Sequence, residues 1–332
     1  MNARDGSWIG IKKSGRTSRP WYALAQLVFV ALAVPGPAAA QGPTVVYEVQ
    51  SKYQHITVVD TAYGFRQLIF DAQLDGSDPI QSELELANPD VPTLSYARHV
   101  MASLPLVAAE RRILVVGLGG ACIQRFLHKL LPDAVIETAE LDPEVRKVAA
   151  AYFFLKEDAR QLVHIGDGRA FIEGSKDKYD LIILDAFSAT SIPYHLSTRE
   201  FLQAVRARLA PGGVVCANLW DSEASFWDMV RTYAAVFPEL HILRCSASAN
   251  SLVMAMPERV GLTVQGWEEK ASAFEKAHPT GLDLPSLIER GAAATVDIPN
   301  SARILLDKKG SGLISGFEPS SAGEGVGFGF LF

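Results

Sequence analysis

Cysteine is scarce in this chain of 332 residues, which contains three: Cys122, Cys216 and Cys245. Three cysteines cannot form a disulfide framework, and an odd number leaves at least one thiol free. Cys216 and Cys245 lie in apolar runs that predict two strands separated by a third, so we expect two core residues and no bond between them. We expect Cys122 to pack beside a glycine turn; a thiol activated at a helix start is the alternative.

Paired metal ligands and excess positive charge are also lacking. The histidines are scattered, without a second His or Cys at ligand spacing, so no metal is expected. The formal net charge is −6, with 31 Lys and Arg against 37 Asp and Glu. Nucleic-acid binding, which depends on clustered basic residues, is therefore disfavoured. A small cationic partner is compatible with this charge.

No long apolar run follows the N-terminal region, and the run within it, Trp21 to Val34, has only fourteen residues. That is too short for a comfortable membrane span. Five basic residues precede the run and Ala38-Ala39-Ala40 follows it, a pattern typical of a secretory signal peptide cleaved after Ala40. We expect an exported protein, periplasmic or secreted, with no stable membrane span after cleavage; an uncleaved anchor is the alternative. Removing residues 1–40 takes away those five basic residues and Asp5, which changes the formal net charge from −6 to −10.

Four short segments rich in glycine and acids follow apolar runs that predict buried strands. They are Gly117-Leu118-Gly119-Gly120, Glu140-Leu141-Asp142, Gly166-Asp167-Gly168 and Asp185-Ala186-Phe187. The strands are expected at residues 111–116, 134–139, 161–165 and 179–184, and helical spacing resumes at 122–131 after the first segment. Ligands of open α/β sheets bind at the carboxyl ends of the strands. We therefore expect the four segments to face one pocket; the alternative is that the acids only cap helices.

The first two segments indicate which ligand fits. Glu140 lies 23 residues beyond Gly117, near the offset of about 20 at which an acid reaches ribose hydroxyls. Cys122 stands where a dinucleotide fingerprint needs its third glycine, and no Gly-Lys-Ser/Thr follows the turn. An acid-rich pocket repels phosphates and favours a cation. S-adenosylmethionine, or its decarboxylated form, meets these requirements as a donor substrate.

These motifs resemble those of spermidine synthases and of the spermidine-synthase-like branch of class I S-adenosylmethionine-dependent transferases. The resemblance covers residues 53 to 220, about half of the chain. Its further pieces are Tyr53-Gln54-His55-Ile56, Gln81-Ser82, Tyr96-Ala97-Arg98 and the turn Leu209-Ala210-Pro211-Gly212-Gly213 before a strand at 214–219. The resemblance implies aminopropyl transfer to a polyamine. Methyl transfer from S-adenosylmethionine, and an exported protein that binds nucleosides or polyamines without catalysis, are the alternatives.

The resemblance also implies roles for individual residues. The donor would be bound near its sulfur by Gln81, along its tail by the glycine turn, at its ribose by Glu140 and at its adenine amino group by Asp167. Asp185 would take the proton from the attacking amine. The residues implied to touch the donor are Gln81, Gly117, Gly119, Gly120, Glu140, Asp167 and Gly168, and those implied to line the acceptor site are Tyr96 and Ser188.

Two positions depart from the family pattern. Gly120 stands where spermidine synthases have an Asp that would bind the free amine of a decarboxylated donor, and Ser188 stands where a second Asp would anchor a diamine. An ammonium group without a counter-charge is costly in a buried pocket. Acids that could substitute are Asp71, Asp75, Asp78, Glu83 and Glu85. His195 could approach the acceptor from the loop after Asp185, but an exposed loop histidine is the favoured interpretation.

The predicted fold is α/β: a Rossmann-like, doubly wound, mostly parallel sheet of the class I methyltransferase type with a small N-terminal antiparallel β unit. One large domain is expected, and a homodimer is left open. Its parts are a signal peptide at 1–40, a β-hairpin unit at 45–75, a linking segment at 76–108 with a helix at 94–106, the core at 109–257 with a helix at 198–209, helical segments within 258–307 and a disordered Gly/Ser-rich tail at 308–332.

Overall fold

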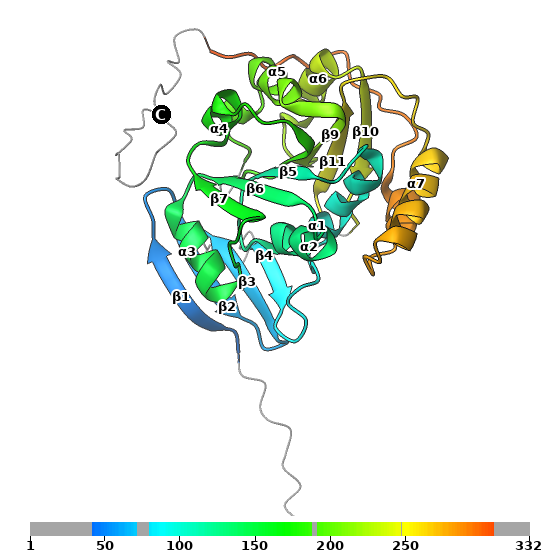
Figure 1. Cartoon of the computed structure of the whole chain (residues 1–332). Helices are drawn as coiled ribbons and strands as arrows, with labels where there is room; N and C mark the ends of the chain where they lie inside the picture. The colour runs from blue at the N-terminus through cyan, green and yellow to red at the C-terminus, as the bar shows by residue number, and fades with distance from the viewer. Residues whose placement is uncertain (1–41, 72–79, 188–190, 247, 309–332) are drawn as a thin grey trace, which may run out of the picture. The chain divides into compact units, whose positions relative to one another are not determined.

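The computed structural model describes residues 42–71, 80–187, 191–246 and 248–308 (Figure 1). The predicted signal peptide, Asp75, Asp78 and Ser188 lie outside the described residues, as does the tail from residue 309. The described strands form two sheets, one of four strands and one of seven.

The N-terminal unit is an antiparallel sheet whose strands follow chain order. They are β1 (Thr44–Gln50), β2 (His55–Asp60), β3 (Phe65–Phe70) and β4 (Ile80–Glu85). The predicted hairpin corresponds to β2 and β3, but the unit does not end near residue 75, because β4 lies in the stretch predicted as a linker. The sequence of β4 gives little indication of a strand, because only Ser82 and Leu84 are buried and the apolar alternation is weak.

The larger sheet has the strand order β10-β11-β9-β8-β5-β6-β7. Its strands are β5 (Arg112–Val116), β6 (Val135–Glu140), β7 (Gln161–Ile165), β8 (Tyr179–Leu184), β9 (Leu209–Trp220), β10 (Glu239–Arg244) and β11 (Asn250–Met256). The five strands from β5 to β9 run parallel, and β11 and β10 complete the sheet antiparallel. This topology confirms the predicted Rossmann-like, mostly parallel fold. Because β11 separates β9 from β10, Cys216 and Cys245 lie two strands apart, and both are free thiols.

Strand β9 begins earlier than expected. Leu209 already pairs with Tyr179 on β8, and the next pair is Leu181 with Val214. The turn-forming residues Pro211, Gly212 and Gly213 lie between these two pairs as an irregularity inside the strand instead of a turn before it. Glycine permits the positive φ of 73° at Gly212, which lets the chain bulge and rejoin the ladder.

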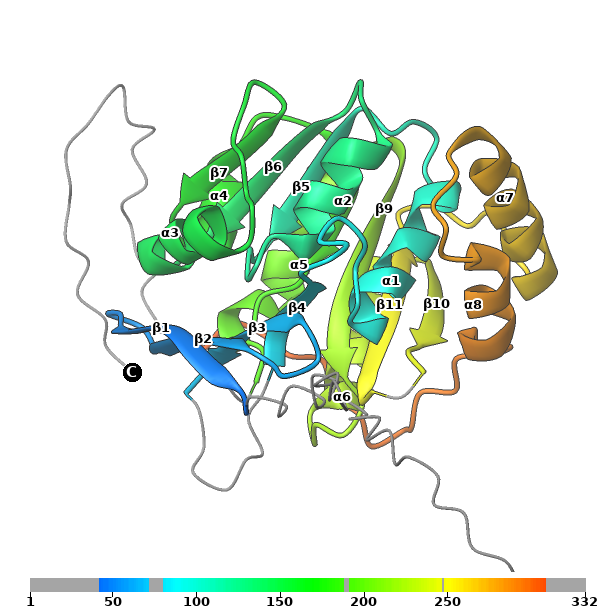
Figure 2. The same ribbon diagram turned by 90° about the horizontal axis from the view of Figure 1, so that it is seen from below.

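Helices cover both faces of the large sheet (Figure 2). One core cluster joins a sheet face to α1 (Ser95–Val100), the 3₁₀ helix Met101–Leu106, α2 (Cys122–Leu130), α7 (Val264–Ala277) and α8 (Leu284–Gly291). A second cluster joins the opposite face to α4 (Gly168–Gly174), α5 (Arg199–Ala207) and α6 (Phe226–Val236). Helix α3 (Pro143–Tyr152) packs with the N-terminal sheet.

The predicted linking helix at 94–106 is divided. It is α-helical only to Val100 and continues as a 3₁₀ helix that contains Pro105. Proline disfavours the α conformation of the residue before it, which accounts for the change. Both halves are largely buried, and Ala102 accepts a hydrogen bond from the indole nitrogen of Trp267 on α7 at 2.8 Å.

The helical segments predicted within residues 258–307 correspond to α7 and α8, and the described residues after α8 form no helix. We call residues 303–307 the C-terminal strap. Arg169 on α4 donates two hydrogen bonds to the Asp307 carboxylate, at 2.8 and 2.7 Å. The amide of Arg199 donates to the carbonyl of Leu305 at 2.8 Å. The strap therefore joins α4 to the start of α5.

Candidate active site

The glycine turn after β5 has the strained backbone that its sequence predicts. Gly117 and Gly119 have positive φ angles of 103° and 51°. Ala121, which precedes α2, also has a left-handed φ of 56°, a conformation that its sequence does not signal. A side-chain carbon on Gly117 would overlap the carbonyl oxygen of Asp185. The turn therefore depends on glycine both for its φ and for its contact with the end of β8.

Ser82 holds the other end of this turn. Its hydroxyl accepts a hydrogen bond from the amide of Gly120 at 2.8 Å, so β4 of the N-terminal sheet contacts the turn directly. A Cβ atom on Gly120 would lie 2.7 Å from the ring of Phe153 and 2.9 Å from Cβ of Ser82. The space for a carboxylate-bearing side chain at position 120 is already filled. The sequence gives no signal for this contact beyond the Gln81-Ser82 resemblance.

Glu140 lies at the end of β6, beside the turn. One carboxylate oxygen accepts from the amide of Leu118 at 2.9 Å, and the other accepts from the amide of Asp142 at 2.7 Å. The side chain is buried, and burial raises the pKa of Glu140 to about 7, although these amide bonds oppose the shift. Each carboxylate oxygen can accept a second hydrogen bond. Glu140 can therefore bind two ribose hydroxyls while it braces the glycine turn.

Asp142 adds an acid to this part of the site that sequence analysis did not select. Its Oδ1 caps α3 by accepting from the amide of Glu144 at 2.9 Å, and its Oδ2 is buried without a hydrogen-bond partner among the described residues. Tyr53 lies near these acids. Burial and the charges of Asp142, Glu140 and Asp167 raise the pKa of its hydroxyl. A donor hydroxyl would satisfy the unpaired oxygen of Asp142.

Asp167 caps α4 at the end of β7 and also binds His195. Its Oδ1 accepts from the amide of Ala170 at 2.9 Å, and its Oδ2 lies 2.7 Å from Nε2 of His195. Burial favours the neutral acid, but the hydrogen bonds from His195 and from the amide of Ala170 hold the pKa of Asp167 below its usual value. His195 is exposed, as expected, yet it contacts the acid implied to bind adenine and is not a free loop histidine.

Gly168, the third residue of that segment, has a packing role. A side-chain carbon there would overlap the side chain of Val116 at the end of β5. The absence of a side chain at Gly168 thus lets the first turn of α4 pack closely against the end of β5. The structure gives Gly168 no direct route to a ligand, and its implied role in donor binding stays a prediction.

Asp185 lies at the end of β8 and is partly exposed. Its carboxylate accepts a hydrogen bond from the side-chain amide of Asn218 at 2.9 Å and a further one from the hydroxyl of Tyr96. Burial raises the pKa of Asp185 to about 7, and these two hydrogen bonds limit the rise. The same Tyr96 hydroxyl also donates to the carbonyl oxygen of Gln81 at 3.1 Å, so its one proton is shared between the two acceptors. The implied acceptor residue Tyr96, the implied base Asp185 and the backbone of Gln81 therefore meet at one point.

Three acids that could substitute for the carboxylates missing at positions 120 and 188 make contacts within the N-terminal sheet. Asp71 accepts from the amide of His55 at 2.9 Å, and Glu83 accepts from the side-chain amide of Gln67 at 2.7 Å. Glu85 pairs in register with Phe65. A role for any of them in holding an ammonium group stays a prediction.

Cys122 is a packing residue, as expected. Its thiol contacts the carbonyl oxygen of Glu83 at 3.5 Å, and burial raises its pKa to about 12. Among the described residues, no group of three or more His, Cys, Asp or Glu side chains could hold a metal ion. In the same part of the chain, no helix is long and apolar enough to cross a membrane.

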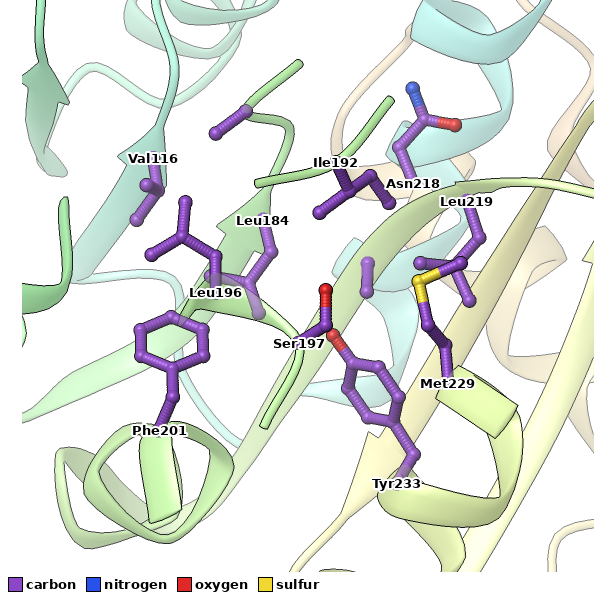
Figure 3. Close-up of a pocket in the computed structure, with 12 residues that line it drawn as sticks. Val116, Leu184, Ile192, Leu196, Ser197, Phe201, Asn218, Leu219, Met229 and Tyr233 are labelled. Atoms are coloured by element: carbon purple, nitrogen blue, oxygen red, sulfur yellow. The ribbon is translucent and has the colours of Figure 1, made fainter. Parts of the chain in front are cut away.

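A small cavity lies between β8, β9, α5 and α6 (Figure 3). The hydroxyl groups of Ser197 and Tyr233 point toward each other there, whereas the amide of Asn218 points away. Its volume is about 20 Å³, enough for about one water molecule. The cavity is therefore too small for an adenosyl compound, and the predicted donor site at the strand ends lies outside it.

Comparison with known proteins gives matches over most of the chain. The spermine/spermidine synthase domain matches residues 95–246. A polyamine aminopropyltransferase of Vibrio vulnificus is 33% identical over 275 residues, which cover 80% of this chain and 89% of that protein. The structure of a probable spermidine synthase from Corynebacterium glutamicum superposes with a TM-score of 0.62 at 17% identity, covering 83% of this chain and 100% of that one, and supports the fold.

A methyltransferase gives a shorter match. The eEF1A lysine and N-terminal methyltransferase of Bos taurus is 33% identical over 160 residues, which cover 45% of this chain and 23% of that protein. The chain thus spans about a quarter of that relative but nearly the whole of the Vibrio protein.

Proposed function

The chain belongs to the spermine/spermidine synthase family, and from this membership we propose that it transfers an aminopropyl group from decarboxylated S-adenosylmethionine to a primary amine of a polyamine. The observation that carries the proposal is the position of Asp185, which directly follows β8 and whose backbone carbonyl lies against the glycine turn. A donor bound over that turn would have its reactive carbon close to this acid. Transfer from a sulfonium depends mainly on such alignment.

The proposed reaction needs one proton acceptor. The amine nitrogen attacks the carbon next to the sulfonium sulfur, the carbon–sulfur bond breaks, and its electron pair stays on sulfur as a neutral thioether. The attacking nitrogen loses its proton to Asp185, whose pKa of about 7 suits that exchange near neutral pH. Tyr96 and Asn218 hold the carboxylate by hydrogen bonds.

The acids at the ends of β6 and β7 would hold the rest of the donor. Glu140 would accept from the ribose hydroxyls, and Asp142 offers an additional unpaired oxygen. Asp167 would accept from the adenine amino group beside His195. These groups supply no chemistry of their own. They fix the donor so that its sulfonium end faces Asp185.

Methyl transfer from intact S-adenosylmethionine is the second candidate, and Gly120 favours it. The turn has no carboxylate at this position for the free amine of a decarboxylated donor, and Phe153 and Ser82 fill the space. A donor that carries its own carboxylate has less need of that acid, because its amine already has a neighbouring negative charge.

Product mass distinguishes the candidates. The protein is incubated with putrescine and either donor, and the expected result is an aminopropylated product from the decarboxylated donor. A methylated product would favour the second candidate, and tight donor binding without turnover would favour a non-catalytic binding protein. Asp185→Asn should abolish turnover and spare donor affinity. The matched control is Asp133→Asn, which changes an exposed acid before β6, at the opposite end of the sheet.

We also propose that the protein is exported and that its mature form begins at Gln41. The proposal rests on the N-terminal pattern of basic, apolar and small residues. The mass of the protein recovered from the periplasmic fraction and the medium tests it: a mass that includes residues 1–40 would contradict cleavage. Sedimentation of the same sample tests for the homodimer.

A further inference from the structure

The base Asp185 is the end of a chain of side-chain amides. The amide nitrogen of Asn250 donates to the side-chain oxygen of Asn218 at 3.0 Å, and the amide nitrogen of Asn218 donates to the Asp185 carboxylate at 2.9 Å. Asn218 is buried near the end of β9, and Asn250 opens the neighbouring antiparallel strand β11. Asn250 is too far along the chain from Asp185 for sequence patterns to connect them.

Asn250 and Asp185 both favour the same orientation of the Asn218 side chain, with its nitrogen directed at the carboxylate. An asparagine amide has an oxygen that only accepts and a nitrogen that only donates. The nitrogen of Asn250 requires the oxygen of Asn218, which leaves the nitrogen of Asn218 for the carboxylate. Without Asn250, the Asn218 amide can rotate by half a turn and direct its oxygen at Asp185. That arrangement repels the ionised acid.

Few other groups near Asp185 can change charge. The titratable side chains that interact with it are Tyr96 on α1 and Cys216 on β9, and Cys122 on α2 and Cys245 after β10 lie beside Tyr96. Burial raises the pKa of all four, so they are neutral at physiological pH. The ionisation of Asp185 therefore depends on its burial and on the donors that Tyr96 and Asn218 direct to it.

We propose that Asn250 is a positioning residue for the transfer reaction: it fixes the orientation of Asn218, and through it the geometry and ionisation of Asp185. This inference rests on the proposed function, because it assigns Asp185 as the base. A hydrogen bond to an ionised group is stronger than one between neutral groups. Its loss should therefore change the pH at which the base becomes active as well as the rate.

The test compares Asn250→Leu, which keeps the branching of the side chain but no polar group, with Asn250→Gln, which keeps an amide donor. In Asn250→Leu, the acidic limb of kcat against pH should move to higher pH by roughly one unit, and kcat at pH 7 should fall roughly fivefold, with the KM for the donor unchanged. Asn250→Gln should recover part of the rate. The matched control, Ser248→Ala, removes an exposed hydroxyl that contacts only the backbone amide of Asn250 and should leave the profile in place.

A double substitution tests whether Asn250 acts through Asn218. Asn218→Ala should shift the profile at least as far as Asn250→Leu, and combining the two should add nothing further, because the shared path is already broken. The inference would be overturned if Asn250→Leu lowered kcat in the Asn218→Ala background by the same factor as it does in the unmodified protein. Thermal melting and donor calorimetry on each variant confirm that it is folded.

A readout without turnover separates this inference from the proposed function. The carboxyl carbon of Asp185 is titrated by NMR in the protein without substrate. An upward shift of its midpoint in Asn250→Leu supports the inference, and an unchanged midpoint overturns it. If the midpoint moves but the unmodified protein transfers no group from either donor, the proposed function fails while the positioning of Asp185 by Asn250 stands.

Discussion

The backbone of Gly117 lies directly against the carbonyl oxygen of Asp185, so the turn proposed to bind the donor and the residue proposed as the base are in backbone contact. The amide of Asp185 also donates to the carbonyl of Val116, the residue before the turn, at 2.8 Å. Holding the two reactants on adjoining backbone segments would lower the entropic part of the barrier to a displacement reaction. The contact also predicts which glycine is least replaceable.

Gly117→Ala should destroy donor binding. The substituted methyl group would overlap Asp185, and the φ of 103° is unfavourable for any residue with a Cβ. We expect at least a hundredfold loss of donor affinity by calorimetry, which corresponds to about 2.7 kcal/mol. Gly64→Ala is the matched control, because Gly64 has a similar φ of 82° but open space around it. It should lower stability by about 1 kcal/mol and leave donor affinity unchanged; equal donor affinity in both variants would contradict the contact.

Gly120→Asp should not create an anchor for a decarboxylated donor. Its side chain would collide with Phe153, which is fully buried, and with Ser82. Overpacking of this kind costs about 1–3 kcal/mol, and we expect a lower melting temperature and weaker binding of both donors. Ser82→Ala serves as a reference, since it loses the hydrogen bond to Gly120 without adding volume. A variant that binds the decarboxylated donor more tightly than the unmodified protein does would show that the turn can open.

Activity and stability should respond to pH in opposite directions. Burial raises the pKa of Asp185 and of Glu140 to about 7, well above the values of the unfolded chain. The base is active when deprotonated, so kcat should rise with pH through about 7. Because both folded pKa values are raised, the stability from the protonated acids is complete below about pH 4 and is lost as pH rises to about 7. Urea unfolding at several pH values measures this trend, and an acidic limb of kcat near pH 4 would argue against a base with a raised pKa.

Asp307→Asn should loosen the C-terminal strap and the adenine side of the site together. Arg169 binds the Asp307 carboxylate and also donates to the carbonyl of His195 at 3.2 Å. The guanidinium is mostly buried, so we expect a loss of about 1–3 kcal/mol in unfolding free energy. Donor affinity should fall a fewfold because the loop that carries His195 is less well held. Asp297→Asn, which removes only a contact with the exposed Thr295, should change neither quantity.

The parallel core could be predicted from sequence because its signals are local. The runs at 161–165 and 179–184 are bounded by glycine, lysine and acids, and they coincide with β7 and β8. The acids at their ends could be assigned to one pocket because parallel strands finish at the same edge. Strand β4 escaped prediction, and β1 was predicted only as an unassigned part of the unit at 45–75, because most of their residues are exposed or only partly buried.

The contacts that complete the site could not be predicted, since each joins residues far apart in the chain. Ser82 reaches Gly120 from another sheet, and Asn250 reaches Asn218 across two strands. Neither serine nor asparagine carries a spacing signal of its own. Likewise, the offset of Glu140 indicated a ribose contact but not its bond to the amide of Leu118.

The hydrogen bond between Glu140 and the amide of Leu118 means that this part of the proposed donor site is formed before a donor binds. Glu140 already holds the loop at Leu118 and the first residues of the next helix at Asp142. These two segments need no further ordering when an adenosyl compound binds beside Glu140, which lowers the entropic cost of binding. The thioether product keeps the same ribose and adenine, so it should bind the same preformed site after transfer. It should therefore compete with the next donor for that site.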